Sequence, residues 1–198
     1  LIKSGIPIFE ITTDERYLKF SLELTETLIE NFGDEEGMFF ITSKMKDDII
    51  IRNKQIVDNV MPNANAVMIE NLTKLDFITG ERKYSQLNTK IIQDYSSRIN
   101  KEYFVICSFL NSLDFFNNYQ SIIITGINKD DNKKIYDQLI KKYLPNTIIL
   151  MINEKTNIIS KNNFLNQIEI KSESSIYLCK NNTCSLPSKN VEEILKMI

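Results

Sequence analysis

Five polar side chains that could bind a ligand lie close together in one segment of this 198-residue sequence. Two cations, one carboxylate and two amides make up the group: Arg52, Lys54, Asp58, Asn63 and Asn65. Carboxylates and amides accept and donate hydrogen bonds to hydroxyl groups, and cations add further donors. The group therefore predicts a loop that binds a polyhydroxylated ligand such as a sugar.

Local structure offers a second explanation for the same loop. Asn63 directly precedes a predicted helix, a position where asparagine commonly caps the first turn. Aspartates such as Asp58 are frequent turn formers. The sequence leaves both explanations open, the ligand site and the purely structural role.

The chain contains no histidine, which removes the usual general base near neutral pH and the commonest metal ligand. Catalysis of the Ser-His-Asp or Cys-His type is therefore excluded within this chain. A glycosidase would need two carboxylates roughly 5 to 10 Å apart. The candidates are Asp34, Glu35, Glu36, Asp58 and Glu70. Such acidic runs are usually solvated turns, so the residues leave catalysis open, and we expect no cofactor and no metal site.

Three cysteines raise the question of thiol chemistry. Cys179 and Cys184 have four residues between them, whereas redox dithiols have two, and zinc would need more ligands than the chain offers. We interpret both as half-buried structural cysteines at a strand end, and the alternative is a disulfide or a redox pair. Cys107 lies in an apolar segment and is predicted to be in the core. An odd number of cysteines favours a reducing compartment, the cytoplasm.

Charge and hydropathy exclude two classes of partner. Lys and Arg total 24 against 26 Asp and Glu, so no basic excess exists to bind nucleic acid or an anionic membrane surface. The apolar runs are far shorter than the ~20 residues that span a bilayer. The chain begins with Leu1 and carries no signal pattern, so we expect a piece of a longer protein without targeting information.

Helical periodicity dominates the first 118 residues. Thr12 and Glu15 have capping-box spacing, and Gly33 supplies a stop. Nearly every face of the segment 103–116 is apolar, which is typical of a helix enclosed by others. Short β-prone runs at 38–42 and 49–52, separated by the polar residues 44–48, predict a hairpin. The predicted helices are 13–32, 63–80, 81–97 and 103–116.

Residues 119–198 read as a small α/β tail. Strands are predicted at 122–125, 147–152 and 176–179, with a helix at 131–143, a loop at 153–166 and a closing helix at 190–198. Gly126 follows the first strand, but the other glycines of a dinucleotide-binding loop are missing, so nucleotide binding is not expected. The fold class is mainly α with an α/β tail, divided into 1–118 and 119–198.

A weak internal repeat supports helical hairpins in the first part. The segment 11–17 (ITTDERY) returns as 78–84 (ITGERKY), and each copy introduces a long amphipathic helix. A spacing of two helices plus their loops is what stacked helix pairs predict.

Several stretches resemble the thioredoxin-domain-containing family with mammalian and bacterial members. They are residues 24–30 (LTETLIE), 34–40 (DEEGMFF), 52–54 (RNK), 58–65 (DNVMPNAN), 143–146 (YLPN) and 177–187 (YLCKNNTCSLP). The resemblance implies an N-terminal thioredoxin domain joined to a six-hairpin toroid similar to N-acylglucosamine 2-epimerases and some glycosidases. This chain would be its C-terminal part, the last hairpins and the tail, with the thioredoxin site outside it.

Two departures limit what the resemblance carries over. About twelve helices close such a toroid, and only four are predicted before residue 118, so we expect a partial α/α toroid. The family's Pro-Ser-Gly-Asn-Ser stretch reads Pro-Asn-Ala-Asn-Ala at 62–66, which keeps Pro62 and Asn65 but changes the rest of the loop.

Three functions follow as hypotheses. The first is the accessory part of a toroid that recognises or processes carbohydrate. The second is an interaction module whose exposed helix face packs on the missing hairpins of the parent chain, or on another copy in a homodimer. The third is a thiol redox role through Cys179 and Cys184.

Overall fold

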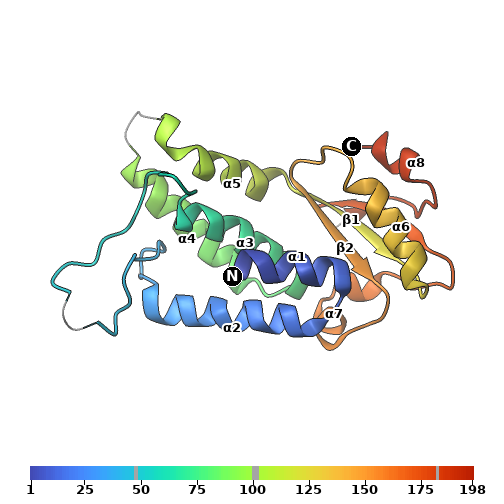
Figure 1. Ribbon diagram of the computed structural model, residues 1–198, viewed down its shortest axis with the longest axis horizontal. Helices are drawn as coiled ribbons and strands as arrows, with labels where there is room; N and C mark the ends of the chain where they lie inside the picture. The colour runs from blue at the N-terminus through green and yellow to red at the C-terminus, as the bar shows by residue number, and fades with distance from the viewer. Residues whose placement is uncertain (47–48, 100–102, 182) are drawn as a thin grey trace.

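The computed structural model describes residues 1–46, 49–99, 103–181 and 183–198, and it has a helical half and a half built on a sheet (Figure 1). The helices are α1 (Ile2–Thr12), α2 (Glu15–Phe32), α3 (Ala64–Thr79), α4 (Lys83–Arg98), α5 (Cys107–Asn118), α6 (Lys129–Leu139), α7 (Asn157–Lys161) and α8 (Val191–Leu195). The strands are β1 (Gln120–Thr125), β2 (Thr147–Ile152), β3 (Ser175–Lys180) and β4 (Thr183–Cys184), and the 3₁₀ turns are η1 (Tyr103–Ile106) and η2 (Leu165–Gln167). The prediction of a mainly α fold with a small α/β part is confirmed.

The ends of α2 follow from local signals, although the cap is not the residue predicted. Asp14 caps the helix, because its side chain accepts a hydrogen bond from the backbone amide of Arg16. Thr12, the predicted cap, is instead the last residue of α1. Gly33 ends α2 as expected, and its amide donates to the carbonyl of Ile29.

The first helix, α1, has no counterpart among the predicted elements. Gly5 and Pro7 lie inside it, and both are poor helix formers, so the sequence hides this helix. Tertiary packing stabilises α1, because Ile6 and Phe9 are fully buried. Gly5 lies so close to α2 that a Cβ at this position would overlap the Ser21 hydroxyl. The missing side chain therefore permits the close α1–α2 pairing.

The central helix is α3, and the prediction that the segment 103–116 is central is wrong. Eleven of the sixteen residues of α3 are buried, and the helix contacts α1, α4 and α5. In α5 only Phe109 and Ser112 are buried, while Phe104 in the preceding turn is 95% exposed. Several apolar residues of this segment, Phe104, Val105 and Leu110, are therefore exposed to solvent. Residues 100–102, which directly precede this segment, lie outside the described residues.

Cys107 is also exposed, so its predicted place in the core is wrong. It is the first residue of α5, and its thiol donates to the carbonyl of Phe104 rather than packing against α3. The position on the outer side of α5 follows from the packing of this helix through a single face.

The long connection between α2 and α3, residues 33–63, extends away from the helices at one end of the molecule (Figure 1). The hairpin predicted at 38–42 and 49–52 is wrong, since neither run forms a strand in the described part of the loop. A single backbone hydrogen bond of 2.9 Å joins the amide of Ile41 to the carbonyl of Asn53. Asp47 and Asp48, part of the predicted connection, lie outside the described residues.

The sheet has the strand order β2-β1-β3-β4. Strands β1 and β2 are parallel, with Ile122 opposite Ile149, and α6 connects them. Strand β3 is antiparallel to β1, with Ile123 opposite Tyr177, and β4 extends the sheet beyond β3. The predicted β-α-β unit with an added strand is confirmed.

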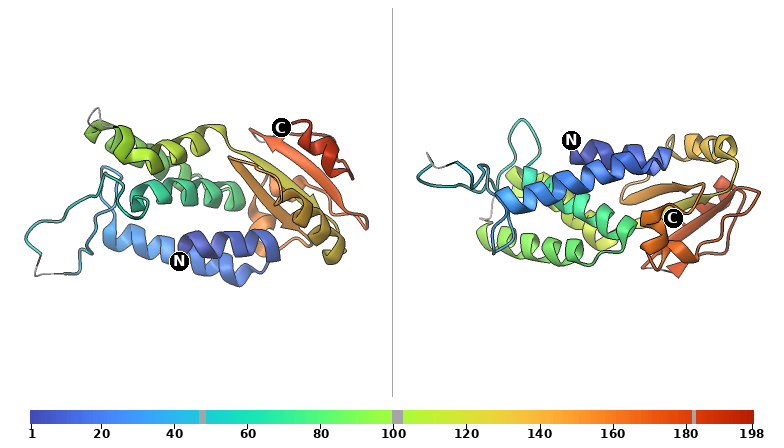
Figure 2. Two further views of the ribbon diagram at one scale, coloured as in Figure 1. Left: turned by 45° about the horizontal axis from the view of Figure 1, so that its top comes forward. Right: turned by 90° about the horizontal axis from the view of Figure 1, so that it is seen from below.

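Alternate residues of β1 serve two different cores. Ile123 faces the helical half and shares one buried cluster with α1, α3 and α4. Ile122 and Ile124 face the opposite side, where Leu139 of α6 and Val191 of α8 cover them. Figure 2 shows α6 and α8 on the side of the sheet away from the long helices. The division of the chain into domains 1–118 and 119–198 stays a prediction.

Two shorter elements correct the predictions for the tail. The predicted loop 153–166 contains α7 and part of η2, whose Ile159 and Leu165 are fully buried. The closing helix is capped by Asn190 as predicted, but it ends at Leu195. None of the described helices combines the length and the apolar character that crossing a bilayer requires.

Candidate functional site

The structure brings the five predicted ligand residues together around the loop 33–63, yet each of them binds the protein itself. Asn63 is the N-cap of α3, and its side-chain amide donates to the carbonyl of Gln55 at 2.8 Å. Asn65 accepts from the amide of Phe39 at 2.7 Å and donates to the carbonyl of the same residue at 3.1 Å. The Asn65 side chain thus pairs with the backbone of Phe39 through two hydrogen bonds, as a neighbouring β-strand would.

Asp58 links the loop to α5. One carboxylate oxygen accepts from the backbone amide of Ser108 at 2.8 Å, and the other accepts from the Ser108 hydroxyl and from the amide of Asn63 at 2.9 Å. Burial raises the pKa of Asp58, but these hydrogen bonds lower it by more, so the net pKa is lowered. A carboxylate with three donors already in place has little capacity left for a ligand.

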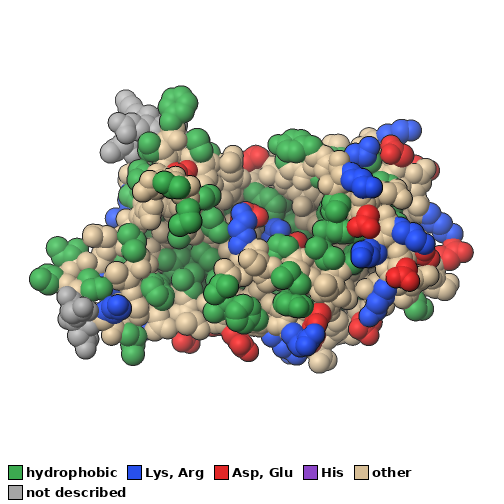
Figure 3. Space-filling model, viewed as in Figure 1, with side chains coloured by type: hydrophobic (Ala, Val, Ile, Leu, Met, Phe, Trp, Pro, Cys, Tyr) green, Lys and Arg blue, Asp and Glu red, His purple; other side chains and the backbone are tan. Residues whose placement is uncertain are grey.

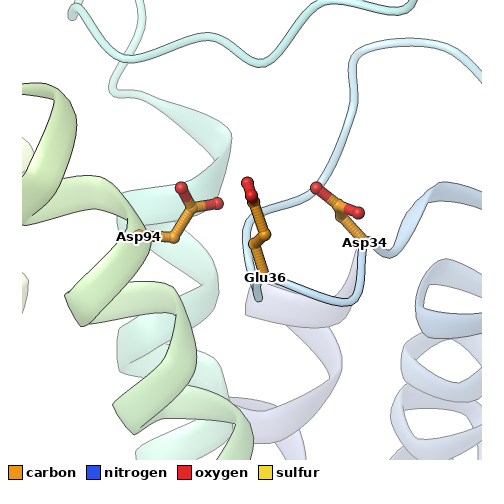
Figure 4. A group of neighbouring side chains, drawn as sticks. All are labelled: Asp34, Glu36 and Asp94. Carbon is orange, nitrogen blue, oxygen red and sulfur yellow. The ribbon is translucent and has the colours of Figure 1, made fainter.

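Lys54 lies at the centre of a charge cluster, which we define as Asp34, Glu36, Lys54, Asp94 and Arg98. Its ammonium forms an ion pair with Asp34, with Glu36 at 3.2 Å and with Asp94 at 2.6 Å. The side chains of Lys54 and Asp94 are only 6% and 3% exposed. Figure 4 shows the three carboxylates pointing toward one another, Asp94 from α4 and the other two from the loop.

Arg98 completes the charge cluster from the next turn of α4. Its guanidinium contacts Asp94 at 2.5 Å and Glu36 at 2.7 Å. Burial raises the pKa of Asp94, whereas the hydrogen bonds from Lys54 and Arg98 lower it, and the net pKa is lowered. Burial lowers the pKa of Lys54, but its carboxylate partners raise it by more. Both residues therefore stay charged around neutral pH.

Three carboxylates this close could in principle hold a metal ion, since their oxygens lie within 4.8 Å of one another. The Lys54 ammonium contacts all three, however, and so occupies the position of a cation. The charge cluster is accordingly a structural device that fastens the loop to α4. None of its groups is free to act as a general base.

Arg52 fastens the base of the same loop. Its guanidinium donates to the carbonyl of Thr42 at 2.9 Å and to that of Asn31 at 3.3 Å, and it lies 4.0 Å from the centre of the Phe40 ring. The Arg52 guanidinium is therefore already bound by the aromatic ring and the two carbonyl groups. Sugar binding by Arg52, Lys54, Asp58, Asn63 and Asn65 stays a prediction.

The two cysteines of the tail form a disulfide. Cys179 in β3 pairs with Cys184 in β4, five positions further along the chain. This is the alternative to the half-buried free cysteines that we favoured from the sequence. Asn182, in the connecting loop, lies outside the described residues. A redox role for the pair stays a prediction.

The disulfide gives a direct chemical prediction. In the native, unreduced protein, iodoacetamide should modify Cys107 alone, because Cys107 is exposed and the other two sulfurs are bonded. After reduction and unfolding, three sites should react. Replacing Cys184 by serine should cost about 2 kcal/mol, the loop-closure term for so short a loop. Peptide mass spectrometry reads the sites, and three modified cysteines in the unreduced protein would contradict the pairing.

Two large polar hollows lie outside the loop, and most of their charges are paired. A cavity of about 630 Å³ adjoins the α1–α2 turn, where Glu15 accepts from the amide of Ile158 and Lys155 donates to three carbonyls. A groove of about 480 Å³ runs between α3, α5 and residues 143–147. There Lys74 pairs with Glu10 at 3.2 Å, and Glu70 pairs with Lys3 at 2.9 Å.

A third hollow is apolar, and sequence reasoning did not locate it. It measures about 440 Å³ and lies beside the first turn of α1, between α2 and α3. Its apolar lining comprises Leu1, Ile2, Leu24, Leu28, Phe32, Ala64, Val67 and Met68. We call it the apolar groove. In α2 the spacing of Leu24 and Leu28 was visible in the sequence, but the partners from α1 and α3 were not.

Comparison with known proteins shows distant relatives that match along the whole chain. The sequence is 21% identical to spermatogenesis-associated protein 20 of Homo sapiens and of Mus musculus, over 205 aligned residues that cover all of this chain and 26% of each relative. It is 20% identical to an uncharacterised protein of Caenorhabditis elegans, over 98% of this chain and 27% of the relative. No protein-family model matches. The chain spans about a quarter of the length of these relatives.

Proposed function

We propose that this chain is a helical packing module, and that its apolar groove and the adjoining face of α2 bind a second copy of the chain. The observation that carries the proposal is the apolar groove itself. Of its eleven lining residues only Lys3 is charged, and only Thr27 and Asn71 are polar without charge. An open apolar surface of this kind on a water-exposed face is typical of a protein interface.

The distribution of side chains over the surface supports this role. In Figure 3 hydrophobic side chains gather over the helical half, around a hollow beside α2, whereas lysine, arginine and acidic side chains gather over the half that contains the sheet. Charged residues are depleted at the centres of protein interfaces. The uneven distribution favours the helical half as the interface.

A stripe along α2 supports a second copy as the occupant. Tyr17, Phe20, Leu24 and Leu28 recur at helical spacing, with Tyr17 38% and Phe20 45% exposed. The stripe both lines the apolar groove and continues beyond it. The same surface can therefore supply a helix face and receive one, which is the condition for a two-fold symmetric contact.

The resemblance to a six-hairpin toroid supports the same kind of packing. In such a fold each helix pair is covered by the next, and the relatives are about four times as long as this chain. A groove that accepts a second copy would offer the same apolar face to a neighbouring hairpin in a longer protein.

The predicted oligomeric state tests the proposal. Light scattering should find the 198-residue chain as a dimer at micromolar concentration, and Leu24→Glu should weaken the dimer at least about tenfold, because it buries an unpaired carboxylate in the groove. The matched control is Leu186→Glu, since Leu186 is 87% exposed in the tail. A monomeric wild-type chain, or equal effects of the two variants, would rule the proposal out.

A further inference from the structure

A small pocket lies where the helical half meets the sheet, and we call it the junction pocket. It measures about 260 Å³ and is formed by the last turn of α3, the start of α4, the residue before β1 and the segment after α7. Its charged and aromatic lining residues are Asp76, Phe77, Arg82, Tyr119, Lys161 and Phe164.

The wall that α7 contributes is held firmly in place. The side-chain amide of Asn162 donates to the carbonyls of Phe77 and Ile78 at 2.8 and 3.1 Å, and its oxygen accepts from the amides of Phe164 and Leu165. This one buried side chain ties the segment after α7 to the end of α3. The pocket is therefore formed before any ligand arrives.

Three aromatic rings form the apolar side of the junction pocket. Phe77 contacts Tyr119 edge to face, with ring centres 6.1 Å apart, and lies 6.2 Å from the ring of Phe164. Such a group offers both flat faces and edges to an apolar body. Burial and the nearby Asp76 carboxylate raise the pKa of Tyr119, so its hydroxyl remains a hydrogen-bond donor at neutral pH.

Two cations of the pocket are left unpaired by the fold. Within the part of the chain that the structure describes, neither the Arg82 guanidinium nor the Lys161 ammonium forms an ion pair or a hydrogen bond. Unpaired cations at the rim of a preformed pocket attract an anionic group.

Asp76 contributes a carboxyl group to the same pocket as these two cations. Its Oδ1 atom is buried, and no described residue gives it a hydrogen bond. A buried acceptor without a donor is destabilising. Burial raises the pKa of this carboxyl more than Ser85 and Arg82 lower it. The Asp76 carboxyl lines the junction pocket, so a positively charged group of a ligand there would be attracted to it.

We infer that the junction pocket binds a small zwitterion of the amino-acid type. The ligand's carboxylate faces Arg82 and Lys161, its ammonium donates to Asp76, and its side chain lies on the aromatic wall. Inorganic phosphate fits the two cations but is repelled by Asp76. A simple carboxylate leaves Asp76 without a donor, and a simple amine leaves both cations without a partner.

A matched set of probes tests the inference on the 198-residue chain. Isothermal titration calorimetry should detect L-phenylalanine or L-leucine binding with a dissociation constant of about 1 mM or below. 3-Phenylpropanoate lacks the amine and 2-phenylethylamine lacks the carboxylate, and each should bind at least about tenfold more weakly, as should phosphate.

Variants separate the pocket from general charge effects. Arg82→Gln and Lys161→Gln should each weaken amino-acid binding about tenfold, and Asp76→Asn should erase the preference over 3-phenylpropanoate. The control is Lys133→Gln, an exposed lysine on α6 outside the pocket. Circular dichroism confirms that each variant is folded. No binding by either amino acid, equal binding of phosphate, or an equal effect of the control would overturn the inference.

Discussion

Replacing Lys54 by methionine should destabilise the protein by about 3–5 kcal/mol, the usual cost of removing one partner from a buried ion pair. The substitution keeps the length of the side chain but leaves Asp34, Glu36 and Asp94 facing one another, with Arg98 as the remaining cation. Urea unfolding followed by circular dichroism at pH 7 measures the loss. The loop 33–63 should also become sensitive to protease, because the charge cluster fastens it to α4.

The pH dependence of this effect has a definite sign. The pKa values of Asp34 and Asp94 are lowered by their cationic partners, so their contribution is present above the ordinary value of 3.8 and is lost as pH falls through the lowered values. The pKa of Lys54 is raised, so its contribution is present below 10.5 and is lost as pH rises beyond the raised value. The wild-type cluster therefore stabilises fully between about pH 4 and pH 10.

The variant should respond to acid in the opposite way. Without the Lys54 ammonium the crowded carboxylates repel one another, and protonation reduces this repulsion. The difference in unfolding free energy between the variant and the wild type should therefore decrease as pH falls from 7 to 4. Lys44→Met is the matched control, because Lys44 is exposed in the same loop and its loss should change stability by less than about 0.5 kcal/mol. Two results would contradict this account of the charge cluster. One is a difference in unfolding free energy that does not change with pH, and the other is a destabilisation by Lys54→Met no larger than that by Lys44→Met.

The elements that could be predicted from sequence are those whose ends carry their own signals. Asn63 and Gly80 bound α3 through a side-chain cap and a left-handed C-cap with φ 73°, and both roles depend on a few neighbouring residues. The strands β1 and β2 were visible as apolar runs because both of their faces are buried. The local sequence is therefore sufficient to predict the ends of α3 and the positions of β1 and β2.

The elements that were missed depend on contacts between distant segments. Helix α1 contains Gly5 and Pro7, and it is stabilised by packing on α2 and α3, which no local rule includes. The opposite error concerns α5, whose apolar composition suggested a buried helix although Phe104 and Leu110 are exposed. Composition gives the tendency to be buried, and only the arrangement of the other helices decides which faces are covered.

The same limit applies to the candidate site. Residue types suggested a ligand site around Asp58 and Lys54 but could not show their partners within the protein. Ser108 lies 50 positions from Asp58, and Asp94 lies 40 positions from Lys54. These partners decide whether a polar group is satisfied within the protein or free for a ligand. The junction pocket could not be predicted from sequence because its lining residues come from four separate segments.

Replacing Leu72 by alanine should cost about 2–5 kcal/mol, the range for truncating a fully buried leucine when the surroundings close the cavity only in part. Leu72 is completely buried in α3, within the cluster that joins the helices to β1 and β2. The measurement is the free energy of unfolding in urea, with the slope compared between variants to check that unfolding remains two-state.

Leu110→Ala is the decisive comparison, because it makes the same chemical change in the helix that the sequence marked as central. Leu110 is 40% exposed in α5, so little apolar surface returns to water and the cost should stay below about 0.5 kcal/mol. If the two costs were equal, or if Leu110→Ala were the larger, α5 rather than α3 would be the centre of the bundle. The apolar groove between α2 and α3 would then need another explanation, since its position depends on α3 being the helix against which α1 packs.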